Sequence, residues 1–163
     1  MSITIPRRAI RHVLRYYIQH YPYDDLSRTR LTKMVYLADW YACQEYHRSI
    51  TAAPWIFSHY GPYSEVIAQE ITRDKIGLIK KSGDPMYGPG REIIEPGRAA
   101  VVSLSARAQS ILQRVLNETM NMSWHELVLC VYHTYPLRTQ PRYARLNLKT
   151  LAAKEQKVSE NTH

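Results

Sequence analysis

Residues 55–66, WIFSHYGPYSEV, gather side chains whose types could do chemistry: one histidine, two serines and several aromatic residues around a Gly–Pro pair. Nucleophilic catalysis requires a Ser or Cys within reach of a base, together with two donors for the oxyanion. Ser58 and His59 are neighbours in sequence, and neighbouring side chains on a strand point to opposite faces. The G-x-S-x-G motif is also absent. The stretch therefore does not predict a Ser–His catalytic pair.

The histidines do not predict a metal site. His12 and His20, and likewise His125 and His133, are eight residues apart, which on a helix separates them by about 12 Å along the axis. The H-E-x-x-H motif and the glycine-rich phosphate-binding motifs are absent. The 14 acidic residues are scattered and do not form obvious pairs for acid–base catalysis. We expect neither enzymatic activity nor a metal or cofactor.

Length and composition indicate one globular domain. The chain has 163 residues, of which 45% are apolar and 22% charged. Cys43 and Cys130 fall in apolar helical patterns, which is typical of buried free thiols and not of a disulfide framework. No apolar run approaches the roughly 18 residues of a membrane span, and the first residues lack the features of a signal peptide. We expect a cytoplasmic protein.

Two helices are predicted in the first 50 residues. Pro6 suits the first turn of a helix that ends before Pro22. A second helix is expected from about Ser27 to His47. In this helix Trp40 projects opposite the main apolar stripe, with Tyr36 and Leu37 on either side of it. A helix that is apolar on two sides is either central to the fold or carries an exposed anchor for a partner, and both interpretations stay open here.

The middle of the chain predicts short strands. WIFSHY is aromatic and apolar enough to form a buried strand, which Gly61 and Pro62 end. Pro62 favours the first turn of a following helix, with an inward face of Tyr63, Val66, Ile67 and Ile71. Residues 78–81 and 92–95 are predicted to be two further strands. The Gly- and Pro-rich segment SGDPMYGPGR between them is expected to be a mobile surface loop.

The C-terminal half predicts two more helices with clear start signals. Ser105 can cap one helix, and Ser123 with Glu126 matches a capping box for the next, which is expected to bury Trp124 and to stop at Pro136. The sum is a mainly α (α+β) single domain of about five helices with a small antiparallel sheet, over residues 1–150. Residues 151–163 are predicted to be a polar, flexible tail.

The formal net charge of +8 leaves nucleic-acid binding open as an alternative function. Basic residues form two groups, neither of which is a compact run, and no standard nucleic-acid-binding motif is present. The first group is Arg7, Arg8, Arg11 and Arg15, and the second is Arg138, Arg142, Arg145, Lys149, Lys154 and Lys157.

Three stretches resemble the Panacea-domain antitoxin family. The family has a helix of the form L-x-K-L-x-Y-x-A, whose places are occupied by Leu31, Lys33, Met34, Tyr36 and Ala38. About twenty residues later the family has an aromatic strand ending in Y/H-G-P, matched by Trp55, His59, Tyr60, Gly61 and Pro62. A similar C-terminal element lies at residues 132–136, so the resemblance covers roughly residues 8–150.

The resemblance implies an antitoxin of a bacterial or phage-borne toxin–antitoxin pair, which binds its toxin protein and neutralises it without catalysis. Some relatives instead act as adaptors that deliver the toxin to a protease. A hetero-oligomer with the toxin or a homo-oligomer is compatible with this role. We expect partner contacts at Tyr36, Trp40, His59, Tyr60 and Tyr63, with Arg7, Arg11 and Arg15 steering an acidic partner. Gly61 and Pro62 are assigned to the architecture of the chain.

Overall fold

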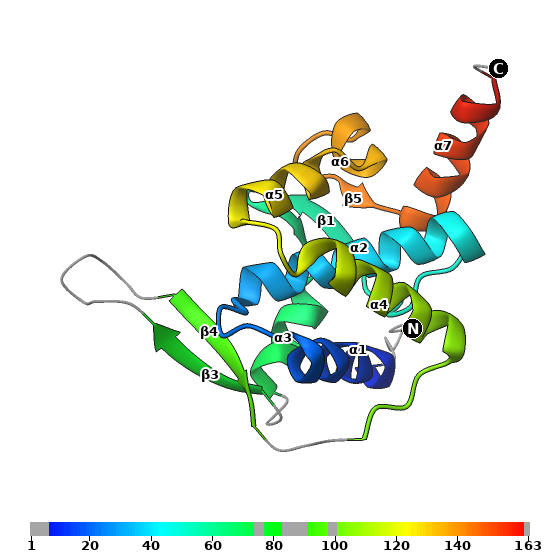
Figure 1. Ribbon diagram of the computed structural model, residues 1–163. Coiled ribbons are helices and arrows are strands. Elements are labelled where there is room, and N and C mark those ends of the chain that lie inside the picture. Colours follow the sequence, from blue (N-terminus) through cyan, green and yellow to red (C-terminus); the bar gives the residue numbers. More distant parts are fainter. Residues whose placement is uncertain (1–6, 74–76, 83–90, 98–100, 162–163) are drawn as a thin grey trace, which may run out of the picture.

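The computed structural model describes residues 7–73, 77–82, 91–97 and 101–161. These residues form seven helices, a three-stranded sheet and a separate two-stranded hairpin (Figure 1). The helices are α1 (Arg7–His20), α2 (Arg28–Tyr46), α3 (Glu65–Arg73), α4 (Ala106–Thr119), α5 (Trp124–Tyr132), α6 (Tyr135–Thr139) and α7 (Leu148–Asn161). The strands are β1 (Trp55–Ser58), β2 (Gly61–Tyr63), β3 (Gly77–Ser82), β4 (Arg91–Pro96) and β5 (Arg145–Leu146). The predicted mainly α class with a small antiparallel sheet is confirmed, with α6 and α7 as additional helices.

Helix α2 occupies the centre of the fold. The Ser27 side chain accepts a hydrogen bond from the Arg30 backbone N–H at 3.1 Å and so caps its N-terminus. The helix packs against α1, α3, α4, α5 and α7, and Figure 1 shows it running through the middle of the molecule. Trp40 is 2% exposed and Tyr36 is fully buried. The two apolar sides of α2 are therefore both covered by the protein itself.

The three-stranded sheet has the order β2-β1-β5, and both pairings are antiparallel. Pro62 pairs with Phe57 inside this sheet, so the prediction that Pro62 begins a helix is wrong. The physical reason is Gly61, whose φ of 108° turns the chain back along β1 before α3 can start at Glu65. The predicted inward face of α3 holds for Val66, Ile67 and Ile71, which are buried.

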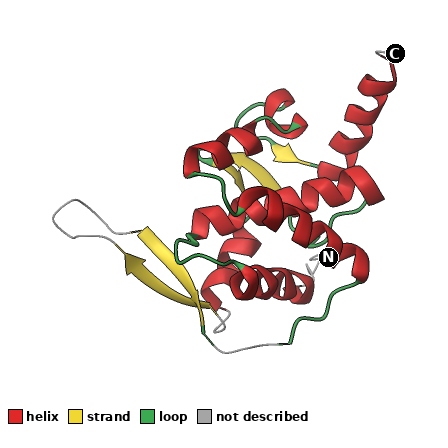
Figure 2. Ribbon diagram, viewed as in Figure 1, coloured by secondary structure: helices red, strands yellow, loops and turns green. Residues whose placement is uncertain are grey.

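Strands β3 and β4 form a second, two-stranded antiparallel hairpin, which Figure 2 shows at the edge of the helical body. The Ile94 backbone N–H donates to the Leu26 carbonyl at 2.8 Å, which ties β4 to the segment that leads into α2. The two predicted strands in this region are confirmed. The loop predicted to be mobile lies mostly at residues 83–90, outside the described residues.

The C-terminal half follows its predicted capping signals. Ser105 caps α4, and Ser123 and Glu126 form the reciprocal capping box of α5. Residues 148–161 form α7, whose first turns bury Leu148 and Leu151 against the body. The segment predicted as a tail is thus helical up to Asn161, and its flexibility stays a prediction. None of the helices in the described part of the chain is long and apolar enough to cross a membrane.

A buried carboxylate on α2 fixes the connection to β1. Asp39 is fully buried, and its Oδ1 accepts backbone N–H bonds from Ile50 and Thr51, both at 2.9 Å. Its Oδ2 accepts from Thr51 Oγ1 at 2.5 Å and from the Trp55 indole Nε1 at 2.9 Å. A buried charge is tolerated only when hydrogen bonds replace the lost water, so these four bonds must form together. Asp39 therefore sets where β1 begins relative to α2.

Replacing Asp39 with Asn tests this arrangement. The amide NH₂ would face two donors in place of an acceptor oxygen, which leaves buried donors without partners. We expect Asp39→Asn to lower the free energy of unfolding by about 3 kcal/mol. Chemical denaturation measures the change. The control is Asp24→Asn, at an exposed carboxylate, which should change the free energy of unfolding by less than about 0.5 kcal/mol. Equal effects in the two variants would contradict the role of Asp39 in fixing the α2–β1 connection.

Candidate functional site

The turn between β1 and β2 presents two exposed side chains, His59 and Tyr60, which we call the hairpin tip. Tyr60 is 79% exposed, and its ring meets the His59 ring edge to face at 4.7 Å between centroids. Tyr60 is the most exposed aromatic side chain among the described residues, and Tyr is among the residue types enriched in binding hot spots. The hairpin tip is therefore the strongest candidate for a partner-binding site among the residues that the structure describes.

Side-chain to main-chain bonds hold the hairpin tip from several directions. Ser58 Oγ donates to the Gly61 carbonyl at 2.8 Å, across the turn. Arg142 Nη1 donates to the His59 carbonyl at 2.8 Å, and its guanidinium lies 5.4 Å from the centre of the Phe57 ring. These contacts come from β1 itself and from the segment before β5. The tip is thus ordered before any partner arrives.

The third support is Lys33, a buried cation on α2 beneath the tip. Lys33 is 3% exposed, and its Nζ donates to the Tyr60 carbonyl at 3.0 Å. The same Nζ lies 5.0 Å from the centre of the Trp124 ring. No carboxylate among the described residues forms a salt bridge with it. Burial lowers the pKa of Lys33 from 10.5 to about 8, so the charge is held at neutral pH by one carbonyl and one aromatic face.

Trp124 is a site residue that sequence reasoning missed. The pattern predicted it to be buried, but it is 42% exposed, so this prediction is wrong. Trp124 is the first residue of α5, where it follows the capping Ser123 and covers Lys33 instead of entering the core beside Leu127. The exposed flank of its ring extends the aromatic surface next to the hairpin tip. The capping box predicted where α5 begins, but it gave no information on which residue of another helix the Trp124 side chain contacts.

The aromatic residues predicted on α2 do not belong to this surface. Tyr36 is fully buried, its hydroxyl is 2.8 Å from Thr134 Oγ1, and its ring lies edge to face with Trp55 at 5.6 Å. Trp40 is 2% exposed. A partner cannot reach either side chain in this conformation, so both are corrected from partner contacts to core residues. Burial was the alternative that the two-sided apolar pattern of α2 left open.

Tyr63 and the arginines of α1 lie apart from the hairpin tip. Tyr63 pairs with Ile56 at the opposite end of β2, where its hydroxyl donates to Glu65. Arg7 donates to Glu70 at 3.1 Å and to Gln69 at 2.8 Å, and thereby joins α1 to α3. Arg11 and Arg15 are half-buried on α1, which Figure 1 shows on the other side of α2 from β1. A steering role for these arginines stays a prediction.

The titration of Lys33 gives a test of its environment. Because the folded pKa of about 8 is below the ordinary 10.5, the unfolded chain binds more protons between these two pH values. The free energy of unfolding should therefore rise with pH across that window, by about 2–3 kcal/mol from this group. Lys33→Met should lack this contribution. The measurement is denaturant unfolding of both proteins at pH 7.5 and pH 10. The difference in the free energy of unfolding between them isolates Lys33, because the tyrosines titrate alike in both. If that difference does not change with pH, the buried cation is contradicted.

Comparison with protein families identifies the architecture around this site. The family model described as antitoxin SocA-like, Panacea domain, matches residues 31–135. This range is well over half of the chain, and it includes Lys33, the hairpin tip and Trp124. Comparison with curated proteins and with solved structures gives no match. The chain belongs to the SocA-like, Panacea-domain antitoxin family.

Proposed function

We propose that this protein is an antitoxin that binds a cognate toxin protein through the hairpin tip and neutralises it by direct contact. Family membership supports an antitoxin role in general. The observation that supports this binding mode is Tyr60, 79% exposed above a turn whose carbonyl is fixed by buried Lys33. A turn whose main chain is already held by hydrogen bonds loses little backbone entropy when it binds. Trp124, 42% exposed, adds a second ring beside it.

A binding role also fits the contacts of the two buried ionisable groups Asp39 and Lys33. Asp39 accepts four hydrogen bonds from the α2–β1 connection and β1, and Lys33 supports the hairpin tip. Both groups have structural partners and neither faces an open pocket. The family likewise supports a regulatory protein and not an enzyme. The activity we propose is therefore recognition of a protein, with no chemical step.

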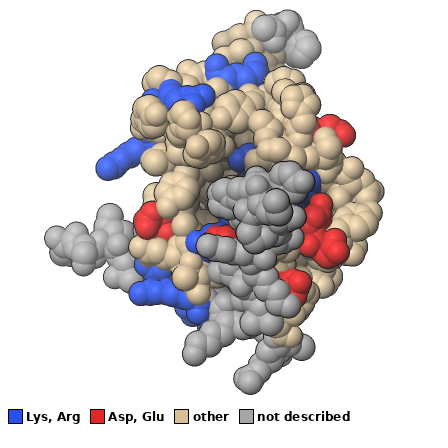
Figure 3. Space-filling model, turned by 90° about the vertical axis from the view of Figure 1, so that its left-hand side faces the viewer, with Lys and Arg blue, Asp and Glu red and all other residues tan. Residues whose placement is uncertain are grey.

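On one face of the molecule, the arrangement of charges favours a protein partner over nucleic acid. Figure 3 shows the face seen from the left of Figure 1, where Lys and Arg lie in separate groups with neutral and acidic residues between them. Nucleic-acid binding relies on several cations that can follow a phosphate backbone. The described residues on that face do not offer such a track.

The hairpin tip can be tested by co-expressing the protein encoded by the neighbouring open reading frame. We expect that protein to arrest growth alone and to be harmless with the wild-type chain. Tyr60→Ala should weaken binding about thirty-fold and abolish rescue, because loss of a central aromatic anchor costs about 2 kcal/mol. The Tyr60 side chain is exposed, so the variant should stay folded. The control is Tyr23→Ala, at a tyrosine 52% exposed on the α1–α2 connection, which should rescue normally.

Purified components separate direct neutralisation from delivery to a protease. Direct contact predicts that the purified chain inhibits the purified toxin with no protease present, at a stoichiometric ratio. Inhibition that appears only in cells, together with a shortened toxin lifetime, would refute direct neutralisation and support an adaptor role. Rescue by Tyr60→Ala equal to that of Tyr23→Ala would refute the hairpin tip as the contact.

A further inference from the structure

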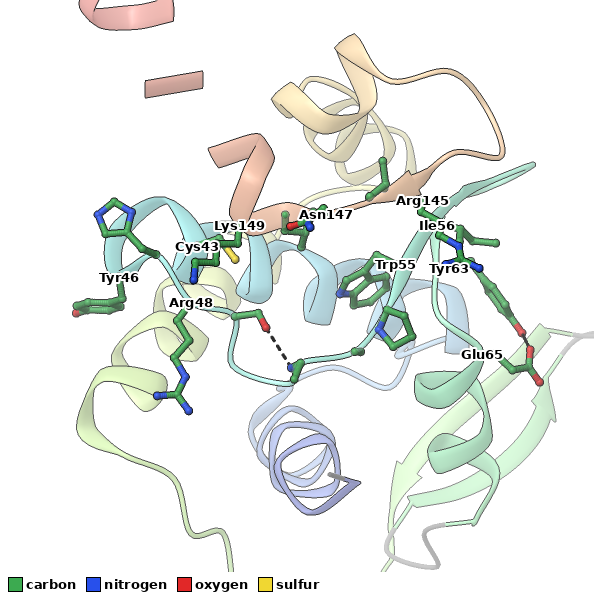
Figure 4. Close-up of a pocket in the computed structure, with 17 residues that line it drawn as sticks. Cys43, Tyr46, Arg48, Trp55, Ile56, Tyr63, Glu65, Arg145, Asn147 and Lys149 are labelled. Carbon is green, nitrogen blue, oxygen red and sulfur yellow. Dashed lines mark hydrogen bonds between the residues drawn. The ribbon is translucent and has the colours of Figure 1, made fainter. Parts of the chain in front are cut away.

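Residues of β1, β2 and β5 in the three-stranded sheet form the floor of a large groove that does not include His59 or Tyr60. Ile56 faces outward from β1 and is half-buried, with Tyr63 and Arg145 as its register partners on the two sides. The C-terminal end of α2 and the N-terminal end of α7 form the walls. We call this cavity, of about 1030 Å³, the sheet groove (Figure 4). Its volume is at the upper end for a small-molecule site and is sufficient for a short peptide segment.

The sheet groove carries positive charge that the protein does not neutralise. Arg48, Arg145 and Lys149 line it, all three exposed, and none has a hydrogen bond or ion pair from its side chain to another described residue. By contrast, the side chains of Arg7, Arg28 and Arg114 each form a salt bridge with a glutamate. The cations of the groove come from three different segments, namely the α2–β1 connection, β5 and α7. Cations collected from separate segments at one cavity favour an anionic partner there.

The sheet groove also holds one carboxylate, Glu65, at the end away from Arg48 and Lys149. Figure 4 shows Arg48 and Lys149 toward one end and Arg145 beside Tyr63, with Glu65, toward the other. Glu65 accepts the hydrogen bond of the Tyr63 hydroxyl, so its carboxylate is fixed at that end. A fixed carboxylate at one end repels a continuous phosphate backbone. A peptide can instead place acidic side chains against the cations and an apolar side chain on Ile56.

We infer that the sheet groove is a second contact site for the toxin and binds an acidic segment of it. This inference rests on the proposed antitoxin function and adds to it the chemistry of the partner. The β1–β2 hairpin carries the hairpin tip at its turn and contributes Ile56 and Tyr63 to the sheet groove, so the hairpin connects the two sites. The aromatic tip supplies apolar contact area, and the groove supplies charge complementarity, which speeds association and selects among partners.

Charge reversal in the sheet groove tests the inference. We expect Arg145→Glu combined with Lys149→Glu to weaken binding to the protein of the neighbouring open reading frame at least about ten-fold at low salt, mainly through a slower association rate. The matched control combines Lys154→Glu with Lys157→Glu, which makes the same change in net charge at exposed positions of α7 outside the groove. The control should change affinity less than about three-fold. Circular dichroism and the unfolding midpoint confirm that both variants fold.

Each outcome decides between the two proposals. If the wild-type chain binds and neutralises the toxin but the groove variant binds as well as its control, the groove inference is overturned and the antitoxin function stands. If the wild-type chain neither binds nor neutralises, both fall. A fluorescent single-stranded oligonucleotide tests nucleic acid as the occupant of the groove. If the oligonucleotide binds the wild-type chain but not the groove variant, and toxin binding is the same in both, the groove is assigned to nucleic acid. Recovery of affinity when an acidic stretch of the toxin is changed to lysine would locate the matching segment.

Discussion

The fold depends on the requirement that polar groups buried on a central helix find partners. Most residues of helix α2 are buried, and they include the polar residues Arg30, Lys33 and Asp39. Each of these side chains bonds to a connecting segment. Arg30 donates to the carbonyls of Thr119 and Met122 in the α4–α5 region, Lys33 to the β1–β2 turn, and Asp39 accepts from the segment before β1. Because unpaired buried charges are costly, three chain segments are fixed to one helix.

Local signals in the sequence predicted the local structure well. The caps at Ser105 and Ser123 and the apolar spacing of the helices depend on residues within one or two turns, so the pattern alone is informative. Pro62 was misassigned because a proline is compatible with a helix start and with a short strand, and the turn at Gly61 decided between them. The positive φ of that glycine is not visible in the spacing of apolar residues.

The candidate site was only partly predictable for a different reason. The sequence named His59 and Tyr60 as expected partner contacts but placed them in a buried strand, whereas they form the exposed turn between β1 and β2, and it gave no sign of the contacts that support them. Lys33 and Tyr60 are 27 positions apart, and Trp124 joins them from a third segment. Such contacts are set by tertiary packing, which periodicity does not encode. The same limit explains the sheet groove, since Arg145 and Lys149 were seen in the sequence only as members of a loose basic group and Arg48 belonged to neither group.

The support of the hairpin tip has a consequence for how the side chains at positions 59 and 60 can be exchanged. Lys33 and Arg142 bond to main-chain carbonyls, and neither bonds to the side chains that the tip presents. The chemistry offered to a partner can therefore be exchanged by mutation at positions 59 and 60 while the scaffold that holds them is unchanged. The side chains that the tip presents and the bonds that hold its main chain are therefore set by different residues. Under the proposed function, substitutions at the tip can change which toxin is bound without passing through an intermediate that fails to fold.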